Sequence, residues 1–238
     1  MDKNSETSHQ VQNNSDKLPF LGKWSIDSTK LWLPLSDVEI LDDSIQYLYQ
    51  NICVDTGEVE KEYKKNSLAI ESDGIKTRYL IQELPYNLGN GRYEQRQYFV
   101  ILFNSKLLRQ RYFDGIDAGN IRSIYKALIS QGVALFSYDT FLDGILTDTD
   151  FKTDVLIEKN GYQSICHYFK INSKQGKRLG VGFKEYRSKD NTGIQFGTRE
   201  HATPGRPYFK LYGKGIEMTA GDFFRLHFPG FQYPGLFR

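Results

Sequence analysis

The second half of the chain is divided into short segments in which apolar and polar residues alternate, and this pattern limits the folds open to it. These segments are bounded by Gly, Asn, Lys or Pro and cover residues 145–157, 164–171, 180–187, 193–199 and 207–214. A period of two is typical of strands that bury one face, and short strands joined by tight turns favour antiparallel pairing. We therefore expect an α+β fold: a largely antiparallel sheet flanked by helices.

The first half adds strands, two expected helices and a polar tail. Residues 1–17 are almost without apolar side chains, which is typical of a disordered tail. Strands are expected after it at residues 24–27, 31–33, 79–81, 98–103 and 133–136. Helices are expected at residues 43–52 and 118–131, and the second of these should be capped by Asp117 and end at Gly132. Trp24 and Trp32 are expected in the core. Residues 18–238 are expected to form a single α+β domain, and any sub-boundary should lie near residues 132–145.

Composition excludes several classes of protein. Cys53 and Cys166 are the only cysteines among 238 residues, which is too few for a disulfide scaffold or a four-thiolate zinc site. The apolar runs, such as residues 98–103, are shorter than the roughly 18 residues that a membrane span needs. No signal peptide is recognisable at the start. We expect a cytoplasmic protein without a membrane partner.

The net charge of +2 conceals a strong separation of charge along the chain. Residues 170–214 hold 11 basic and three acidic side chains, a net charge of +8, and the remainder has a net charge of −6. Concentrated positive potential attracts phosphate backbones through counterion release. The pattern therefore indicates nucleic-acid binding, with an ordinary solvated basic face as the alternative.

Carboxylates recur at alternate positions of one expected strand. A period of two places Asp148, Asp150, Lys152 and Asp154 on one face and residues such as Phe151 on the other. Like charges at this spacing repel unless solvent, a lysine or a cation lies among them, and oxygen-rich clusters suit Mg²⁺ or Mn²⁺. The pattern predicts a metal site, with a solvent-facing polar strand as the alternative.

Tyrosine and lysine alternate in a second expected strand. Tyr208, Lys210, Tyr212 and Lys214 share one face, while Phe209 and Leu211 face the core. Ammonium groups bind phosphate, phenol rings stack on bases, and a phenol beside a cation is a candidate nucleophile because the cation favours the phenolate. An ordinary amphipathic strand is the alternative.

The order of these motifs resembles that of rolling-circle replication initiators, especially the filamentous-phage gene II/X proteins and related plasmid initiators. The acidic strand is followed by Gly197-Thr198-Arg199 and then by Lys210-Leu211-Tyr212-Gly213-Lys214-Gly215 with Glu217. The likeness covers residues 145–217. Those families continue beyond the tyrosine strand, so the resemblance implies a C-terminally short form.

The resemblance implies a DNA nickase that acts at a replication origin of a phage or plasmid in the bacterial cytoplasm. Tyr212 would be the catalytic nucleophile and Tyr208 its reserve, and Asp148, Asp150 and Asp154 would hold Mg²⁺ or Mn²⁺. The residues expected to bind DNA phosphates are Arg199, Lys210, Lys214, Arg206 and Lys184. Partners would be single-stranded or origin duplex DNA and a host helicase or polymerase. The alternatives are a non-catalytic DNA-binding protein of the same fold and a phage structural protein that contacts nucleic acid.

Overall fold

A computed structural model describes most of the first two thirds of the chain and several segments of the last third. The described residues are 22–52, 59–157, 160–165, 167–168, 171, 183–188, 191–196, 208–214, 222–230 and 236–237. The tail predicted at residues 1–17 lies outside them. Within them, no helix is long and apolar enough to cross a bilayer.

A five-stranded antiparallel sheet, here called the main sheet, forms the body of the protein. Its strand order is β5-β6-β7-β1-β9. The bounds are β1 Ser25–Pro34, β5 Ser67–Ser72, β6 Ile75–Gly89, β7 Arg92–Asn104 and β9 Ile145–Lys152. The predicted α+β class with a largely antiparallel sheet is therefore confirmed.

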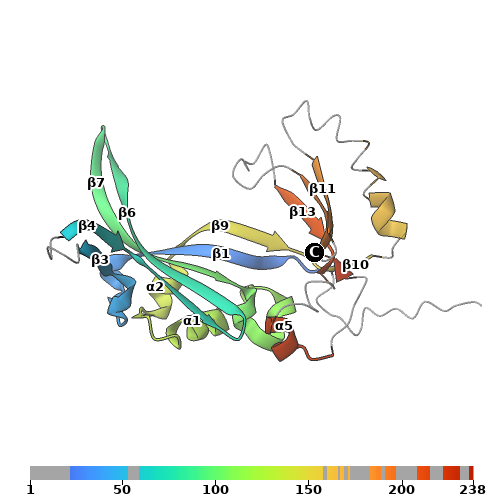
Figure 1. Ribbon diagram of the computed structural model, residues 1–238, viewed down its shortest axis with the longest axis horizontal. Coiled ribbons are helices and arrows are strands. Elements are labelled where there is room, and N and C mark those ends of the chain that lie inside the picture. The colour runs from blue at the N-terminus through green and yellow to red at the C-terminus, as the bar shows by residue number, and fades with distance from the viewer. Residues whose placement is uncertain are drawn as a thin grey trace, which may run out of the picture.

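Helices cover one face of the main sheet and bury the core against it (Figure 1). They are η4 Ser105–Asp114, α1 Ile121–Ile129, α2 Tyr138–Leu142 and α5 Asp222–His227. Alternate strand residues such as Leu31, Leu33, Phe99 and Ile101 point into this core and are at most 1% exposed. Burying a side chain of this size contributes about 1.5–3 kcal/mol. The opposite face of the main sheet, here called the outer face, carries no helix among the residues that the structure describes.

The core is aromatic where η4 meets α5. Phe223 and Phe224 of α5 are buried and pack edge-on against Tyr112 of η4. His227, on the same helix, has a lowered pKa because burial desolvates it and Arg109 repels a further positive charge. α5 is therefore fixed to the main body through rings.

The β6–β7 hairpin extends well beyond the core. Asn90 and Gly91 both have positive φ, 51° and 73°, which is the conformation of a tight two-residue hairpin turn and matches the Asn-Gly turn in the sequence. Burial on the strands ends at Ile81 and Phe99, and residues 83–97 are exposed wherever their exposure is described. We call residues 83–97 the hairpin arm. It bends away from the main sheet toward the outer face (Figure 1).

Smaller sheets complete the described structure. They pair β2 Glu39–Ile40 with β8 Ala134–Leu135, β3 Tyr47–Ile52 with β4 Val59–Lys65, and β10 Val155–Leu156 with β14 Leu236–Phe237. A further sheet has the order β11-β12-β13, with β11 Phe183–Ser188, β12 Asn191–Phe196 and β13 Phe209–Tyr212. Two single-turn helices, η2 Leu35–Asp37 and η3 Asp43–Ile45, lie between β1 and β3.

Several sequence predictions were wrong. The helix predicted at 43–52 is the turn η3 followed by strand β3, because Tyr47, Leu48 and Tyr49 pair with β4. The strand predicted at 164–171 is helical at its described residues. Trp24 is 67% exposed rather than buried, and Trp32 is half-buried on the outer face rather than in the core. The helix predicted at 118–131 exists but is shorter, Ile121–Ile129.

Candidate active site around Tyr212

Strand β13 has the two faces that its sequence predicts. Leu211 is buried and lies opposite Ile194 of β12, which is also buried. Tyr208, Lys210 and Tyr212 are half-buried. The apolar face therefore holds the strand in place while the tyrosines and Lys210 remain partly accessible.

A glycine on the neighbouring strand makes room for Tyr212. Gly193 lies opposite Tyr212 in the β12–β13 register. A Cβ atom at Gly193 would lie 2.5 Å from the Leu211 carbonyl oxygen and 2.9 Å from the Tyr212 Cβ. Because backbone cannot give way as a flexible side chain can, only glycine fits here without moving β13.

Two ammonium groups lie close to the Tyr212 ring. The Nζ atom of Lys210 is 4.5 Å from the ring centroid and that of Lys214 is 5.7 Å from it. Cations at this distance are attracted by the ring, and they also stabilise negative charge that develops on its oxygen. The predicted association of Tyr212 with both lysines is therefore present.

Lys214 does not continue the exposed face of β13. Its side chain is 1% exposed, because the strand ends at Tyr212 and the chain turns inward. Its Nζ lies 5.2 Å from the ring centroid of Tyr112 and 5.0 Å from that of Phe224. Lys214 was predicted to bind phosphate at the surface; its ammonium instead lies in an aromatic cage beneath Tyr212.

A second buried lysine lies close to the Tyr112 ring of the cage. Lys152, at the end of β9, is 3% exposed and its Nζ is 4.1 Å from the Tyr112 ring centroid. This Nζ donates to the Tyr112 carbonyl oxygen at 2.9 Å and to Ser105 Oγ at 3.3 Å, and it lies 3.5 Å from a carboxylate oxygen of Asp27. Tyr112 thus connects Lys152, from the acidic segment, with Lys214, from the tyrosine–lysine segment.

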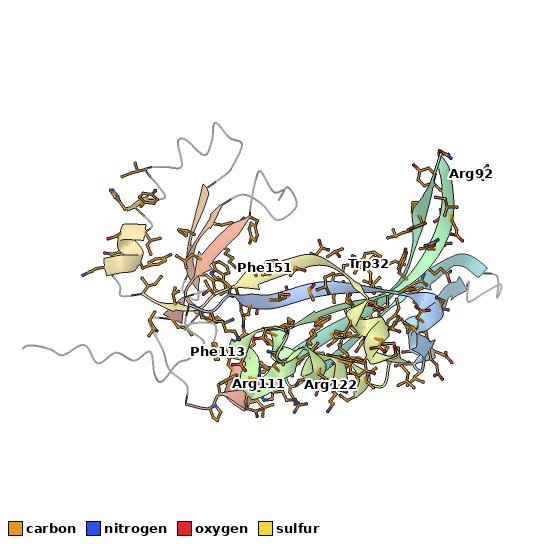
Figure 2. The ribbon with its side chains drawn as sticks, turned by 180° about the vertical axis from the view of Figure 1, so that it is seen from behind. Trp32, Arg92, Arg111, Phe113, Arg122 and Phe151 are labelled. Atoms are coloured by element: carbon orange, nitrogen blue, oxygen red, sulfur yellow. The ribbon has the colours of Figure 1, made fainter. Side chains whose placement is uncertain are left out.

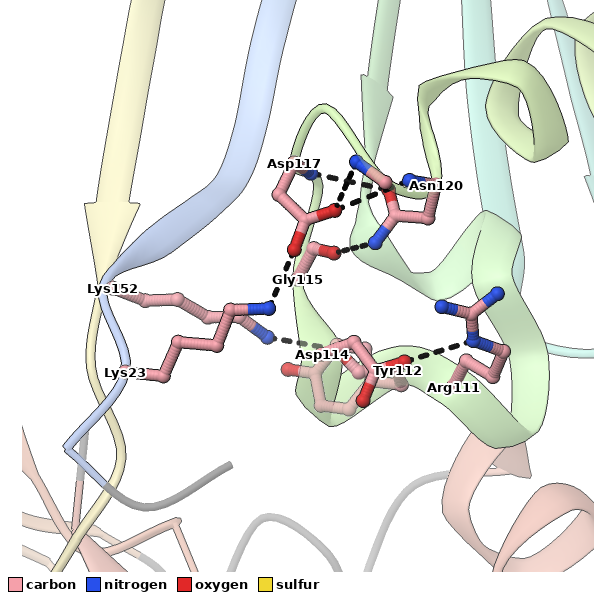
Figure 3. A network of polar contacts seen from close by, with 9 residues as sticks. Lys23, Arg111, Tyr112, Asp114, Gly115, Asp117, Asn120 and Lys152 are labelled. Atoms are coloured by element: carbon pink, nitrogen blue, oxygen red, sulfur yellow. Dashed lines mark hydrogen bonds and ion pairs between the residues drawn. The ribbon is translucent and has the colours of Figure 1, made fainter. Parts of the chain in front are cut away.

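The loop after Tyr112 is fixed by its own polar contacts (Figure 3). Asp117 forms an ion pair with Lys23 and accepts from the backbone N–H groups of Gly119 and Asn120 at 2.9 and 3.1 Å. The hydrogen bond and charge of Lys23, together with these N–H groups, lower the pKa of Asp117. Asn120 Nδ2 donates to the Gly115 carbonyl at 2.6 Å. These contacts hold the backbone that carries Tyr112.

The three aspartates predicted as metal ligands are not on one strand face. Asp148 is exposed and has a φ of 49°, at a bulge where β9 has one residue more than β1. Asp150 accepts a hydrogen bond from Ser28 Oγ at 2.7 Å, and Asp154 is 2% exposed beyond the end of β9. In the described part of the chain, no group of three or more His, Cys, Asp or Glu residues is placed to hold a metal ion. The prediction of a shared face was wrong because it assumed a regular strand.

The remaining predicted DNA-binding residues are described only in part. Lys184 of β11 lies opposite Gln195 of β12, which in turn lies opposite Lys210 of β13, so these positions form one row across the sheet. Arg199 and Arg206 lie outside the described residues. Of the predicted set, the structure therefore brings together Lys210, Lys214 and Tyr212.

Tyr112 and Asp27 belong to this site and were missed in the sequence. Tyr112 lies in η4, whose helical backbone is interrupted at Arg109 and Arg111, so the spacing of residues there carries little information. Asp27 lies at a register shift in β1, where alternation fails. Comparisons of the chain with family models, with curated proteins and with solved structures found no match.

Proposed function

We propose that this protein nicks DNA at a replication origin, with Tyr212 as the nucleophile, and so starts rolling-circle replication. The observation that carries the proposal is the position of the Tyr212 ring beside Lys210 and Lys214, with Nζ atoms 4.5 and 5.7 Å from its centroid. The order of the sequence motifs supports it as well. The predicted substrate is DNA in a bacterial cytoplasm.

The proposed reaction is a transesterification. The Tyr212 phenolic oxygen loses its proton to solvent or a base and attacks the phosphorus atom of a phosphodiester. A bond between phosphorus and tyrosine oxygen forms, and the bond from phosphorus to the 3′ oxygen breaks. The 3′ oxygen takes up a proton, which leaves a 3′ hydroxyl and a 5′-phosphotyrosine. The 3′ end is a primer for a host polymerase, and a host helicase would open the duplex ahead of it.

The lysines have different roles in this proposal. Lys214 is buried with its Nζ 5.7 Å from the Tyr212 ring centroid, so it supplies positive charge that is fixed in position beside the half-buried tyrosine. Lys210 is half-buried and able to reach a substrate phosphate. Arg199, Arg206 and Lys184 stay as predicted phosphate contacts of the same basic region.

A divalent metal remains part of the proposal only as an ion that arrives with the substrate phosphates. Mg²⁺ commonly keeps several waters and binds through one or two carboxylates plus substrate oxygens. Asp148, Asp150 and Asp154 do not fit a shared three-carboxylate site in this structure. No chemical step of the tyrosine is therefore assigned to a metal.

The test is to incubate supercoiled plasmid that carries the cognate origin with the protein and Mg²⁺ or Mn²⁺. We expect nicked circles and DNA covalently attached to Tyr212, identified by peptide mass spectrometry. Tyr212→Phe should abolish both, and Tyr208→Phe, on the same strand face, should retain them. Full nicking by Tyr212→Phe would eliminate Tyr212 as the nucleophile.

A second function is favoured by the scattered aspartates. A protein with the same basic strand and no assembled metal site would bind origin DNA without cutting it. It predicts salt-dependent DNA binding with no covalent product in any metal, including Mn²⁺. Metal-dependent cleavage eliminates this alternative.

A further inference from the structure

The outer face of the main sheet is basic, although the N-terminal two thirds of the chain are acidic overall. Strand positions that alternate with the buried ones place cations on β1, β6 and β7. These are Lys30, Lys76, Arg78, Arg92 and Arg96, against the acidic side chains Glu71, Glu94 and Asp150 and the exposed Asp148 at the β9 bulge. Residues 35–46, 105–143 and 222–227, which include the helices of the other face, hold six basic and nine acidic side chains. Charge is therefore separated across the sheet.

Two of the five outer cations form ion pairs within the described part of the chain. Lys76 pairs with Glu71 at 3.6 Å and Arg96 with Glu94 at 3.0 Å. Lys30, Arg78 and Arg92, by contrast, have no acidic partner among the described residues. In the register, Lys30 and Arg78 both lie opposite Leu102, from the two sides of β7. Arg92 lies at the tip of the hairpin arm (Figure 2).

Aromatic rings hold cations in place on this face. Lys30 Nζ lies 4.5 Å from the ring centroid of Trp32, which packs edge-on against Tyr98 and donates from Nε1 to Thr147 Oγ1 at 2.8 Å. On the arm, the Arg96 guanidinium lies 3.6 Å from the ring centroid of Tyr86. These contacts hold the two cations in place, so this part of the surface offers positive charge at fixed positions. Charge at fixed positions suits recognition of a phosphate backbone.

The outer face is bordered at both ends. The hairpin arm rises at one end of β1 and β9, and the sheet β11-β12-β13 rises on the same side at the other end (Figure 1). β1 has ten residues, which at about 3.3 Å per residue is roughly 33 Å. One helical turn of B-DNA is about 34–36 Å. The bordered surface thus has the length of one turn of duplex.

We propose that the outer face, through Lys30, Arg78 and Arg92, binds the phosphate backbone of duplex DNA. This inference rests on the proposed function, in which the duplex is the segment that flanks the phosphodiester attacked by Tyr212. The outer face is then a docking surface separate from the basic β13 region. Its net positive charge complements the duplex, which carries one negative charge per about 1.7 Å of its axis.

The experiment measures dissociation constants by fluorescence anisotropy from 50 to 300 mM KCl. The probes are a labelled 25-base-pair duplex of random sequence and a labelled 25-nucleotide oligo(dT). The variants are Arg78→Gln and Arg92→Gln, with Arg122→Gln as the matched control. Arg122 is an exposed arginine on the helical side of the sheet (Figure 2). Unchanged urea midpoints show that each variant folds.

For the duplex, the logarithm of the association constant should fall linearly with the logarithm of the salt concentration. We expect the magnitude of this slope to decrease by about 0.9 for each outer arginine removed. Arg122→Gln should leave the slope unchanged, and oligo(dT) should show no loss with any variant. Unchanged slopes for Arg78→Gln and Arg92→Gln would overturn the proposal, as would equal losses with oligo(dT). Self-association that weakens in Arg92→Gln, with duplex binding intact, would assign the arm to a protein interface instead.

The outcome is separable from that of the proposed function. Tyr212→Phe should keep the wild-type duplex slope, because Tyr212 lies on β13 and not on the outer face. If the wild-type protein does not nick DNA but its salt slope depends on Arg78 and Arg92, the nickase proposal is refuted and the docking surface is supported. If it nicks DNA and the slope does not depend on these arginines, the docking surface is refuted and the nickase proposal is supported.

Discussion

Replacing Lys152 by methionine tests whether the buried cation beneath Tyr112 stabilises the fold. Methionine keeps the length and apolar stem of the side chain but removes the ammonium. The lost contacts include a charge-assisted hydrogen bond to the Tyr112 carbonyl at 2.9 Å, a longer one to Ser105 Oγ at 3.3 Å, the contact with the Tyr112 ring at 4.1 Å, and the ion pair with Asp27 at 3.5 Å.

The magnitude follows from the burial of each partner. The hydrogen bond from a charged donor contributes about 1.5–3 kcal/mol, and the desolvated cation–ring contact about 2 kcal/mol. The Asp27 side chain is 28% exposed, so water screens that pair and it adds at most about 1 kcal/mol. Methionine also avoids the cost of desolvating an ammonium, which offsets part of the loss. We expect the free energy of unfolding to fall by about 2–3 kcal/mol.

The assay is urea unfolding followed by tryptophan fluorescence and circular dichroism, with the slope m compared between variants. Lys126→Met, at an exposed position of α1, is the control and should change stability by less than about 0.5 kcal/mol. The double variant Lys152→Met with Asp27→Asn should lose less than the sum of the single variants, by about 1 kcal/mol. A loss below about 1 kcal/mol for Lys152→Met, or strict additivity, would refute the reasoning.

Three further predictions concern other parts of the protein. Gly193→Ala should cost about 1–3 kcal/mol in urea unfolding and reduce plasmid nicking, because β13 and Tyr212 must shift; wild-type nicking would contradict this. The lowered pKa of His227 means that the unfolded chain takes up a proton first, so stability should fall as the pH drops below about 6.5. In His227→Gln, the urea midpoint should change less between pH 7.5 and 5 than in the wild type. The same pH dependence in both proteins would show that His227 is not the group responsible. Tyr79→Phe removes the donor to Gln131 Oε1 at 2.6 Å and should cost about 1–2 kcal/mol in thermal unfolding, with no loss as the contrary result.

Regular alternation in the sequence predicted the faces of strands only where the pairing is regular. On β13, the buried Leu211 and the half-buried Lys210 and Tyr212 follow the pattern because that strand pairs with β12 without a shift. On β9 the same reasoning assigned the end of the strand to the wrong faces, because Phe151 is 67% exposed and Lys152 is buried. A register shift depends on the partner strand, which the residues of β9 alone do not specify.

The candidate site was predictable in its chemistry but not in its assembly. The Tyr-x-Lys pattern identified Tyr212 and Lys214, since both are close in sequence. The cage of Lys214 depends on Tyr112 and Phe224, from η4 and α5, and only tertiary packing brings these elements together. The basic outer face was hidden for a related reason, because its cations come from separate strands that are mixed in sequence with acidic residues.

The bulge at Asp148 has a consequence for insertions and deletions in this protein. Because β9 has one residue more than β1 between the Lys30–Thr147 and Ser28–Asp150 pairs, Thr147 and Asp150 lie on the same face although they are three residues apart. Deleting Asp148 would leave Thr149 opposite Thr29 and keep Phe151 and Lys152 on their present faces. Deleting a residue of β9 outside the bulge would instead move the side chains beyond it to the opposite face. We expect glycine to be tolerated at position 148 because of its φ of 49°, and loss of this residue to be tolerated better than a deletion elsewhere in β9.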